Sequence, residues 1–279
     1  QHVQKGQKLM DDLIDLEMEK IERILAKIES DPEPEGIKRT EKELWLNIKM
    51  KCLEGRRTGF GITAEGDMLA AMGLTYGTDE ATAFAVEVQK TLACSAYRSS
   101  ALMARDRGAF PIYDYKLEEN NPFIQRLKSA DEELYSLMKQ YGRRNIALLT
   151  IAPTGSVSIC TQTSSGIEPA FLVSYRRRRK VNPNDSEATI SFTDDEGQAW
   201  EEYNVLHHKF AVWAEINGYN VADLVHKYTD EQLQEVIAKS PYNNATANCV
   251  NWVNKVKMQG AIQKWVDHSI SVTVNIPKE

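Results

Sequence analysis

The sequence predicts an α/β fold in which parallel strands alternate with helices, and three observations support that prediction. Short apolar or β-branched segments of strand length are separated by longer amphipathic segments of helical periodicity. No internal repeat or low-complexity tract interrupts the 279 residues. Hydrophobic residues make up 42% of the chain and charged residues 27%, which is typical of a folded globular protein. We therefore expect one domain, or part of one, with an α/β core.

The first fifty residues predict two helices joined by a turn. From Leu9 to Ile28 the apolar residues recur mostly at spacings of three and four, as on one face of a helix. The segment 31–36 ends this helix, because it contains two prolines, which lack the amide donor, and a glycine. A second helix with a capping-box spacing at its start is expected from about Thr40 to Leu53.

Strands and helices alternate along the rest of the chain. The predicted helices cover 64–72, 79–107, 131–141, 203–217, 221–226, 230–238 and about 246–257. The predicted strands cover 55–62, 146–151 and 269–276. The continuous apolar run 146–151 is typical of a strand that is buried on both faces of a sheet. The segment 181–200 is predicted to be a polar hairpin insertion that turns at 195–197.

Composition excludes several classes of protein. The formal net charge of −6 argues against a general affinity for nucleic acid. The apolar runs are far shorter than the roughly 20 residues that span a membrane, and the first residues form no signal pattern, so we expect a cytoplasmic protein with no membrane partner. The four cysteines form no CxxC pair, so buried free thiols are expected rather than a zinc or redox centre; they are Cys52, Cys94, Cys160 and Cys249.

The basic run 176–180, which contains four arginines and a lysine, has two interpretations. It is either the solvated end of a strand or a surface that contacts a phosphate or a partner protein. The sequence alone leaves both open.

A turn rich in small hydroxyl residues follows the predicted strand 146–151. It reads APTGSVS at 152–158 and leads into a weakly helical segment. The first turn of a helix leaves amide groups unpaired at the positive end of the helix dipole, so the turn suits an anion such as phosphate. It is neither a P-loop nor a dinucleotide fingerprint, because it has no Gly-Lys-Ser/Thr ending and no triple-glycine spacing. An ordinary N-cap is the alternative.

Four ordered blocks of sequence resemble the catalytic subunit of ribonucleotide reductases. The most specific block reads NIALLTIAPTGSVS at 145–158 and continues as SSGIEPAF at 164–171. The other blocks are KLMDDLIDLE at 8–17, GRRTGFG at 55–61 and QKWVDHSIS at 263–271. They stand in the order that the family has and together extend over nearly the whole chain.

The resemblance implies that residues 1–279 form the C-terminal portion of the ten-stranded α/β barrel of these enzymes, with parallel strands and surrounding helices. It implies that the turn holds the phosphates of the ribonucleotide substrate. The residues assigned to this binding are Pro153, Thr154, Gly155, Ser156 and Ser158. We assign Glu168 to shaping the following loop, since a glutamate in a buried turn is usually part of the hydrogen-bonded structure.

The family abstracts the 3′-hydrogen of the ribose with a cysteine thiyl radical in an Asn-x-Cys-x-Glu loop, and we find no such loop here. The segment 248–251 has the wrong spacing and no glutamate. The radical cysteine of the family lies upstream of all four blocks, and this chain starts at Gln1 inside a predicted helix. We therefore expect a trimmed or split chain without catalytic residues, inactive until an N-terminal half joins it. The reducing cysteines at the family's C-terminus are absent as well.

The forms APTGSVS and WVDHSIS look most like adenosylcobalamin-dependent, class II members, whereas a class I enzyme would need a separate radical subunit. The resemblance implies reduction of ribonucleoside diphosphates or triphosphates to deoxyribonucleotides for DNA synthesis. It implies an external dithiol reductant as a partner and a homodimer of the completed enzyme. We expect no metal site, because the sequence context of His207, His208 and His268 shows no partner carboxylates.

Two other functions remain open at this point. The chain is either a non-catalytic nucleotide-binding or assembly module derived from the same fold, or a scaffold that docks a partner through the basic run 176–180. A half barrel would expose strand edges and apolar faces, so we also expect obligate association with another chain.

Overall fold

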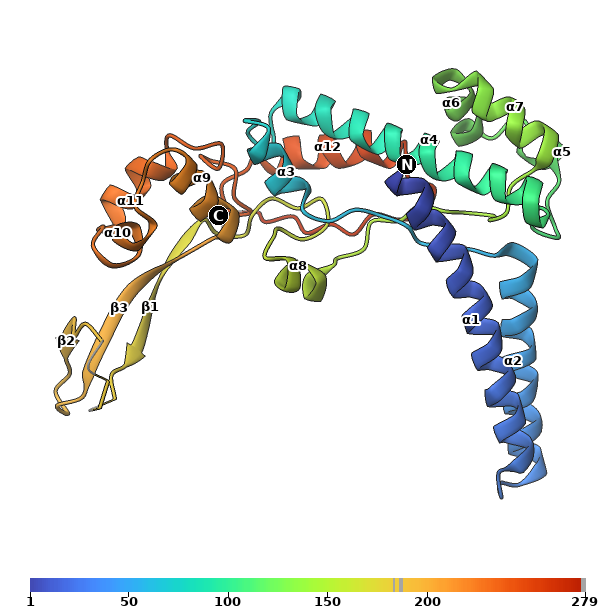
Figure 1. Cartoon of the computed structure of the whole chain (residues 1–279), viewed down its shortest axis with the longest axis horizontal. Helices are drawn as coiled ribbons and strands as arrows, with labels where there is room; N and C mark the ends of the chain where they lie inside the picture. Colours follow the sequence, from blue (N-terminus) through green and yellow to red (C-terminus); the bar gives the residue numbers. More distant parts are fainter. Residues whose placement is uncertain (183, 186–187, 277–279) are drawn as a thin grey trace. The chain divides into compact units, whose positions relative to one another are not determined.

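The computed structural model describes residues 1–182, 184–185 and 188–276 (Figure 1). Its contacts divide the chain into two compact units. Unit 1 consists of Gln1–Gly61, Val86–Ala152 and Gln259–Ile270. Unit 2 consists of Ile62–Ala85, Pro153–Met258 and the described part of 271–279. The chain therefore enters each unit more than once, and helices α4 (Asp79–Arg107) and α12 (Trp252–Gln263) begin in unit 2 and end in unit 1.

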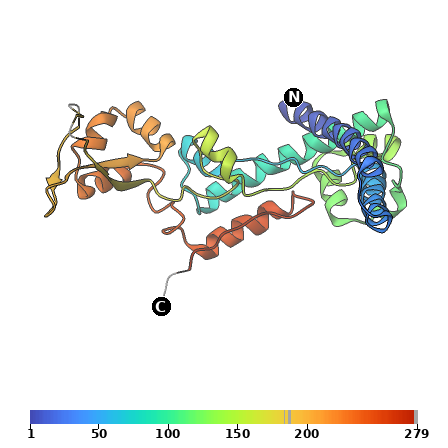
Figure 2. The ribbon, with the colours of Figure 1, turned by 90° about the horizontal axis from the view of Figure 1, so that it is seen from below.

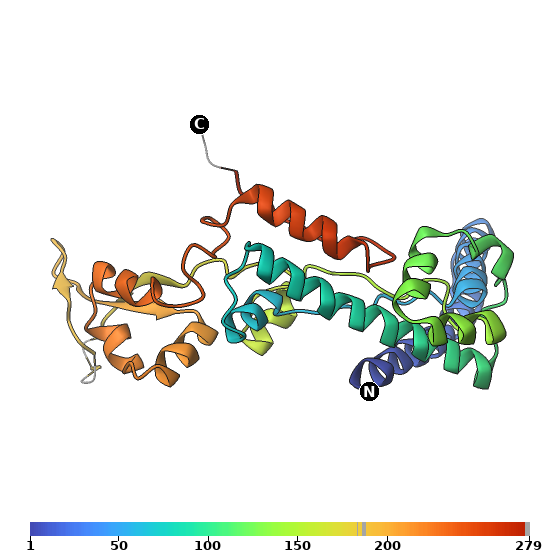
Figure 3. The same ribbon diagram turned by 90° about the horizontal axis from the view of Figure 1, so that it is seen from above.

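Unit 1 is largely helical. Besides its share of α4 and α12, it contains α1 (His2–Ser30), α2 (Glu35–Gly55), α5 (Tyr115–Glu118), α6 (Pro122–Ala130) and α7 (Glu132–Tyr141). Figure 1 shows α1 and α2 side by side as an antiparallel pair, and Figure 3 shows α5, α6 and α7 around the C-terminal end of α4. The predicted start of α2 near Thr40 was wrong. The helix begins directly after Pro34, whose carbonyl accepts hydrogen bonds from the amides of Ile37 and Lys38.

The helices α5 and α6 were not predicted from the sequence. The start of α6 has a local signal that the periodicity search missed, because Asn121 is the N-cap and Pro122 the first helical residue. The side chain of Asn121 accepts a hydrogen bond from the amide of Phe123 at 2.8 Å. The helix predicted over 131–141 is confirmed as α7, whose N-cap is Asp131. The side chain of Asp131 accepts a hydrogen bond from the amide of Leu134 at 2.9 Å.

Three segments predicted as strands are paired in parallel in unit 1, but as isolated bridges. Phe60 bridges Leu149, and Ile151 bridges Ile270, both in parallel. The apolar run 146–151 is mostly buried, as predicted. The length predicted for the third strand was wrong. Its pairing is limited to the bridge at Ile270, after which the chain leaves unit 1, and the described residues 271–276 form no strand.

Unit 2 combines a small sheet with short helices (Figure 2). Its helices are α3 (Glu65–Ala71), α8 (Gly155–Thr161), α9 (His208–Ile216), α10 (Val221–His226) and α11 (Asp230–Ile237). Its strands are β1 (Ser174–Lys180), β2 (Phe192–Thr193) and β3 (Ala199–Leu206), which form an antiparallel sheet in the order β1-β3-β2. A hydrophobic core around Phe210, Leu224 and Leu233 joins helices α9, α10 and α11.

The helix predicted over 203–217 was wrong in its first part. Residues 203–206 belong to β3, which is the central strand and pairs with β1 on one side and β2 on the other. Pairing on both edges outweighs the weak local preference of this segment. The turn predicted at 195–197 is confirmed, since Gly197 has a φ of 81° and its amide donates to the carbonyl of Asp194 at 2.9 Å. Part of the predicted hairpin insertion 181–200 lies outside the described residues, at 183 and 186–187.

The basic run 176–180 lies on β1, at an edge of the sheet, and its side chains are exposed. Several of them pair with acidic groups on β3. The guanidinium of Arg178 contacts the carboxylate of Glu202, and Nε of Arg179 lies 2.6 Å from Oε2 of Glu201. These contacts favour the solvated-strand interpretation, because Glu201 and Glu202 neutralise part of the positive charge across the strand pair.

The cysteine prediction was wrong in one respect. All four cysteines are free, but Cys160 and Cys249 are exposed, and Cys52 and Cys94 are only half-buried. Within the described ranges, none of the helices combines the length and apolar character needed to cross a membrane.

Candidate functional site

The turn after the strand segment 146–151 starts helix α8 with an unusual residue. Thr154 is the N-cap and has φ 52° and ψ 27°, the left-handed region that β-branched residues rarely adopt. Its hydroxyl accepts a hydrogen bond from the amide of Gly166 at 2.7 Å and lies 2.9 Å from the hydroxyl of Thr63. These two contacts stabilise the strained conformation, so the loop that contains Gly166 determines the shape of the turn.

Ser158 closes the first turn of α8 from the inside. Its amide donates to the carbonyl of Thr154 at 2.8 Å, and its hydroxyl donates to the carbonyl of Gly155 at 2.7 Å. The same hydroxyl lies 3.1 Å from that of Ser165, and the side chain is buried. Ser158 is therefore committed to the structure of the turn.

The outer side of the turn carries unused donors. Among the described residues, no acceptor takes a hydrogen bond from the amides of Gly155, Ser156 or Val157, or from the hydroxyl of Ser156. All three residues are exposed, and a Cβ placed on Gly155 would meet no heavy atom within 4 Å. Exposed amides with open space above them can donate to the oxygens of an anion.

The structure thus brings together the five residues that the sequence singled out, but in different environments. Pro153, Gly155 and Ser156 are exposed, Thr154 is half-buried and Ser158 is buried. The hydroxyls of Thr154 and Ser158 already have partners within the protein. The amides of Gly155, Ser156 and Val157 and the hydroxyl of Ser156 have no partner among the described residues, so they can donate to an anion.

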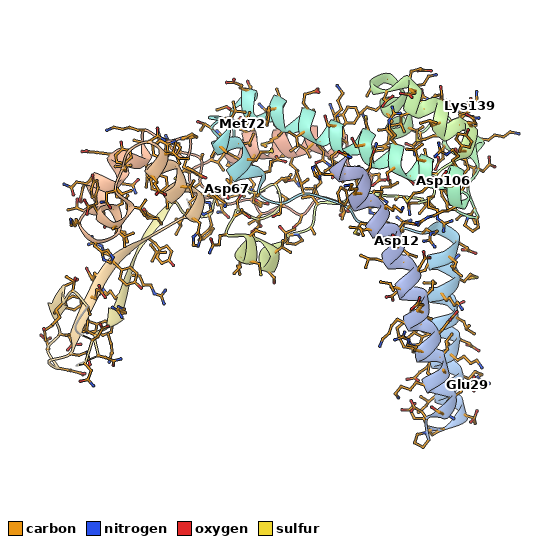
Figure 4. The ribbon with its side chains drawn as sticks, viewed as in Figure 1. Asp12, Glu29, Asp67, Met72, Asp106 and Lys139 are labelled. Atoms are coloured by element: carbon orange, nitrogen blue, oxygen red, sulfur yellow. The ribbon has the colours of Figure 1, made fainter. Side chains whose placement is uncertain are left out.

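A buried carboxylate that the sequence did not reveal contacts the loop that follows α8. Asp67 on α3, labelled in Figure 4, accepts a hydrogen bond at Oδ2 from the amide of Ser164 at 2.7 Å. Its Oδ1 accepts from the hydroxyl of Tyr242 at 2.9 Å and lies 2.7 Å from Nε2 of His207. Burial alone would raise the pKa of Asp67, but the hydrogen bonds from these groups and the nearby imidazole hold it below its usual value.

The expectation that His207 has no partner carboxylate was therefore wrong. Asp67 precedes it by 140 positions, so no local spacing shows the pair. His207 is still no metal ligand by this contact, because a single carboxylate beside an imidazole is a hydrogen-bonded pair rather than a ligand set.

Glu65 is a second buried carboxyl on α3, two residues before Asp67. It is fully buried, and neither of its oxygens has a hydrogen-bond partner among the described residues. Burial raises the pKa of Glu65 to about 8. The group is therefore protonated near neutral pH.

Glu168 has the structural role that we predicted. Its Oε1 accepts a hydrogen bond from the amide of Thr273 at 3.0 Å, and its Oε2 pairs with the buried ammonium group of Lys255. These contacts fix the loop that follows Ser164.

Within the described residues, one group of carboxylates has the spacing of metal ligands, and it lies in unit 1. Asp11, Asp12 and Asp15 offer oxygens within 4.8 Å of one another. Each carboxylate is paired with an arginine: Arg56 contacts Asp11 and Asp15, and Arg107 contacts Asp12. Arg144 also contacts Asp11, so three arginines balance the three carboxylates and the network needs no cation.

The fold and the turn define an α/β protein in which a buried strand leads to a helix start suited to an anion. Residues 37–279 match the family model described as the barrel domain of ribonucleotide reductase. The chain therefore belongs to the ribonucleotide reductase barrel family, and the family predicted from the four sequence blocks is confirmed.

Individual relatives agree with this family. The chain is 27% identical over 229 residues to the vitamin B12-dependent ribonucleoside-diphosphate reductase of Mycobacterium tuberculosis, an overlap of 80% of this chain and 27% of that protein. It is 25% identical to the enzyme of the same name from Thermoplasma acidophilum, over 82% of this chain and 26% of that protein. The chain thus spans about a quarter of the length of these relatives.

A solved structure shows the same fold. The chain is similar to the alpha subunit of the class Id ribonucleotide reductase of Actinobacillus ureae, with a TM-score of 0.57 and 15% sequence identity. The match covers 98% of this chain and 40% of that subunit. It supports the predicted barrel fold, although the described residues of this chain pair in parallel only at isolated bridges.

Proposed function

We propose that this chain forms part of the catalytic barrel of a ribonucleotide reductase and that its turn at 153–158 holds the substrate phosphates. The observation that supports this proposal is the row of exposed amides at Gly155, Ser156 and Val157, for which the described residues provide no acceptor. They lie within the block that most resembles the family, and a phosphate would satisfy them. Ribonucleoside diphosphates are the preferred substrate class, because the relatives from two organisms are named ribonucleoside-diphosphate reductases. Triphosphates are the other class to test.

The residues of the turn have two different roles. The amides of Gly155 to Val157 and the hydroxyl of Ser156 would donate to phosphate oxygens, while Thr154 and Ser158 keep these donors in position. Binding the phosphates orients the ribose, which lowers the entropic part of the activation barrier. We assign no radical chemistry to this chain and propose that an N-terminal half supplies the thiyl cysteine and an external dithiol the electrons. A homodimer of the completed enzyme and a cytoplasmic location complete the proposal.

Adenosylcobalamin is the cofactor that we propose, because two relatives carry vitamin B12 dependence in their names. It would supply the initial radical by homolysis of its cobalt–carbon bond. The contacts of the described residues do not indicate a place for it: Nε2 of His207 lies 2.7 Å from Asp67, and Nε2 of His268 lies 2.9 Å from the guanidinium of Arg57. The cofactor proposal therefore depends on the relatives alone, and a class I radical subunit is the alternative source.

Turnover is the deciding measurement. The chain is assayed with a ribonucleoside diphosphate, adenosylcobalamin and a dithiol, first alone and then mixed with the N-terminal half of a class II reductase. We expect deoxyribonucleotide only from the mixture. Turnover that appears in the mixture only after a radical subunit replaces adenosylcobalamin would assign the chain to class I. Diphosphate binding without turnover in any mixture would favour the non-catalytic module.

A further inference from the structure

We infer that Asp67 is a positioning residue for the phosphate turn and that His207 holds Asp67 in the orientation this requires. The inference rests on the proposed function, since it concerns the geometry of the same turn. It adds two residues, far apart in sequence, that touch no substrate and act through the loop 163–166.

The first step joins α3 to the loop by a reciprocal pair of hydrogen bonds. The amide of Ser164 donates to Oδ2 of Asp67 at 2.7 Å, and the amide of Asp67 donates to the hydroxyl of Ser164 at 3.2 Å. Both residues are buried. A charged acceptor makes the first of these bonds stronger than a neutral one would be, so Ser164 keeps its position relative to α3.

The second step joins the loop to the turn. The amide of Gly166 donates to the hydroxyl of Thr154 at 2.7 Å, and its carbonyl accepts from the amide of Glu65 at 3.2 Å. There is little room for slippage, because a Cβ on Gly66 would lie 2.6 Å from the carbonyl oxygen of Glu168. A shift of the loop would therefore move the hydroxyl of Thr154 and, with it, the first amides of α8.

The third step fixes Asp67 from its other side. Its Oδ1 meets Nε2 of His207 at 2.7 Å and the hydroxyl of Tyr242 at 2.9 Å. The amide of His207 donates to the carbonyl of Val173 at 2.8 Å. The imidazole ring of His207 and the ring of Tyr242 meet edge to face, with centroids 5.8 Å apart. Both carboxylate oxygens are thus oriented by groups that are themselves fixed, so the carboxylate cannot rotate away from Ser164 without losing them.

The alternative is that Asp67 and His207 only stabilise the fold. The positioning role and this structural role predict different results. A positioning residue changes the affinity for the phosphates and leaves the affinity for the nucleoside unchanged. A residue with only a structural role changes the urea midpoint and affects the affinities for the diphosphate and the nucleoside alike. The measurement therefore compares a ribonucleoside diphosphate with the same ribonucleoside without phosphates.

The experiment uses the whole chain and follows its backbone amides by ¹H–¹⁵N NMR during titration. The variants are Asp67→Asn, His207→Ala and His207→Gln, with His208→Gln as the control on the exposed neighbour. Asparagine cannot accept from Ser164 and from His207 with Tyr242 at the same time, because one of its two groups is a donor. We expect Asp67→Asn to weaken diphosphate binding about 10-fold and His207→Ala about 5-fold, the effect of one lost hydrogen bond.

His207→Gln, which retains an N–H donor, should restore affinity to within about 2-fold of wild type. Nucleoside affinity should remain unchanged in all variants, and His208→Gln should behave as wild type. Unchanged diphosphate affinity in Asp67→Asn and His207→Ala, or equal loss for diphosphate and nucleoside, would overturn the inference.

If the proposed function is wrong, the wild-type chain itself binds no diphosphate. This outcome differs from those that would overturn the inference about Asp67 and His207. The inference is still tested in that case by the ligand-free spectra. Asp67→Asn must shift the amide signals of Gly166 and of 155–157, and the absence of such shifts would overturn it. If Asp67→Asn does not fold, His207→Ala gives the same comparison.

Discussion

Ser156 and Ser158 are two residues apart on α8, and their hydroxyls have opposite roles in the structure. Ser156 is exposed and its hydroxyl has no partner among the described residues, whereas that of Ser158 donates to the carbonyl of Gly155. We expect Ser156→Ala to leave stability unchanged and to weaken diphosphate binding about 5-fold, and Ser158→Ala to lower the free energy of unfolding by about 1 kcal/mol. Urea denaturation and NMR titration measure the two effects. The proposal for this turn fails if Ser156→Ala binds diphosphate as tightly as wild type.

Glu65 predicts a pH dependence of stability that runs opposite to the usual one for a carboxyl group. Burial raises its pKa from 4.5 to about 8 in the folded chain. Between these values the unfolded state has lost the proton and the folded state still holds it, so stability falls as pH rises. This contribution of Glu65 to the free energy of unfolding is fully present below about pH 4.5 and is lost by about pH 8. It amounts to up to roughly 5 kcal/mol.

The matched variant for this prediction is Glu65→Gln, which has nearly the same shape and no proton to lose. Its stability relative to wild type should increase steadily from pH 5 to pH 8 in urea denaturation. A difference that does not change with pH would show that Glu65 has a normal pKa. Asp67→Asn serves as a contrast, because the pKa of Asp67 is lowered and it titrates below this range.

At the residue scale, the turn at 153–158 and the helix start that follows it could be predicted, since these residues are contiguous and their chemistry is local. Phosphate binding by the five residues stays a prediction. Asp67 and His207 could not be predicted, because their pairing depends on which distant segments fold together. Glu65 also escaped prediction. An acidic residue in the first turn of a helix normally faces solvent, and only the packing of unit 2 shows that this one is buried.

At the scale of elements, helices with clear end signals were predicted best. The bounds predicted for 79–107 agree with α4, because Gly108, with a φ of 87°, and Pro111 mark its end. Residues 203–206 of β3 were mistaken for helix, because the identity of this strand depends on pairing with β1 and β2. The predicted strand segments 55–62 and 269–276 contain the bridged residues Phe60 and Ile270, but both were predicted too long. A sequence pattern does not specify how many ladder bonds a strand makes.

The close approach of the segments 55–61 and 146–151 gives an element-scale prediction. A Cβ on Gly61 would lie 2.0 Å from the carbonyl oxygen of Thr150, so Gly61→Ala must push the two segments apart. We expect a loss of about 2–3 kcal/mol in the free energy of unfolding. Gly36→Ala is the control, since Gly36 lies in helix α2 with nothing within 4 Å of its Cβ position, and alanine there should stabilise the helix by up to about 1 kcal/mol. Equal stability of the two variants would contradict the observed pairing.

At the scale of the whole molecule, composition and element order were enough for the α/β class, and the ordered blocks for the family. The division into two units could not be predicted. Each unit is assembled from segments that are distant in sequence, so no change of composition marks a boundary. The barrel itself is known from the family and from the similar alpha subunit, because the described residues of this chain carry only part of its parallel pairing.

Exposed apolar side chains in each unit lead to a prediction about association. In unit 2, Ile159 is 78% exposed and Phe171 68%, and in unit 1, Leu9, Leu13 and Leu16 on α1 are all more than half exposed. Large exposed apolar side chains that form a contiguous patch mark surfaces that another chain covers. We expect the isolated chain to bind an apolar fluorescent dye and to self-associate, and the N-terminal half of a class II reductase to suppress both effects. Ile159→Ser should reduce dye binding, whereas Ser136→Ala on the exposed surface of α7 should not change it. A monodisperse chain without dye binding would mean that these side chains need no partner, and obligate association would be excluded.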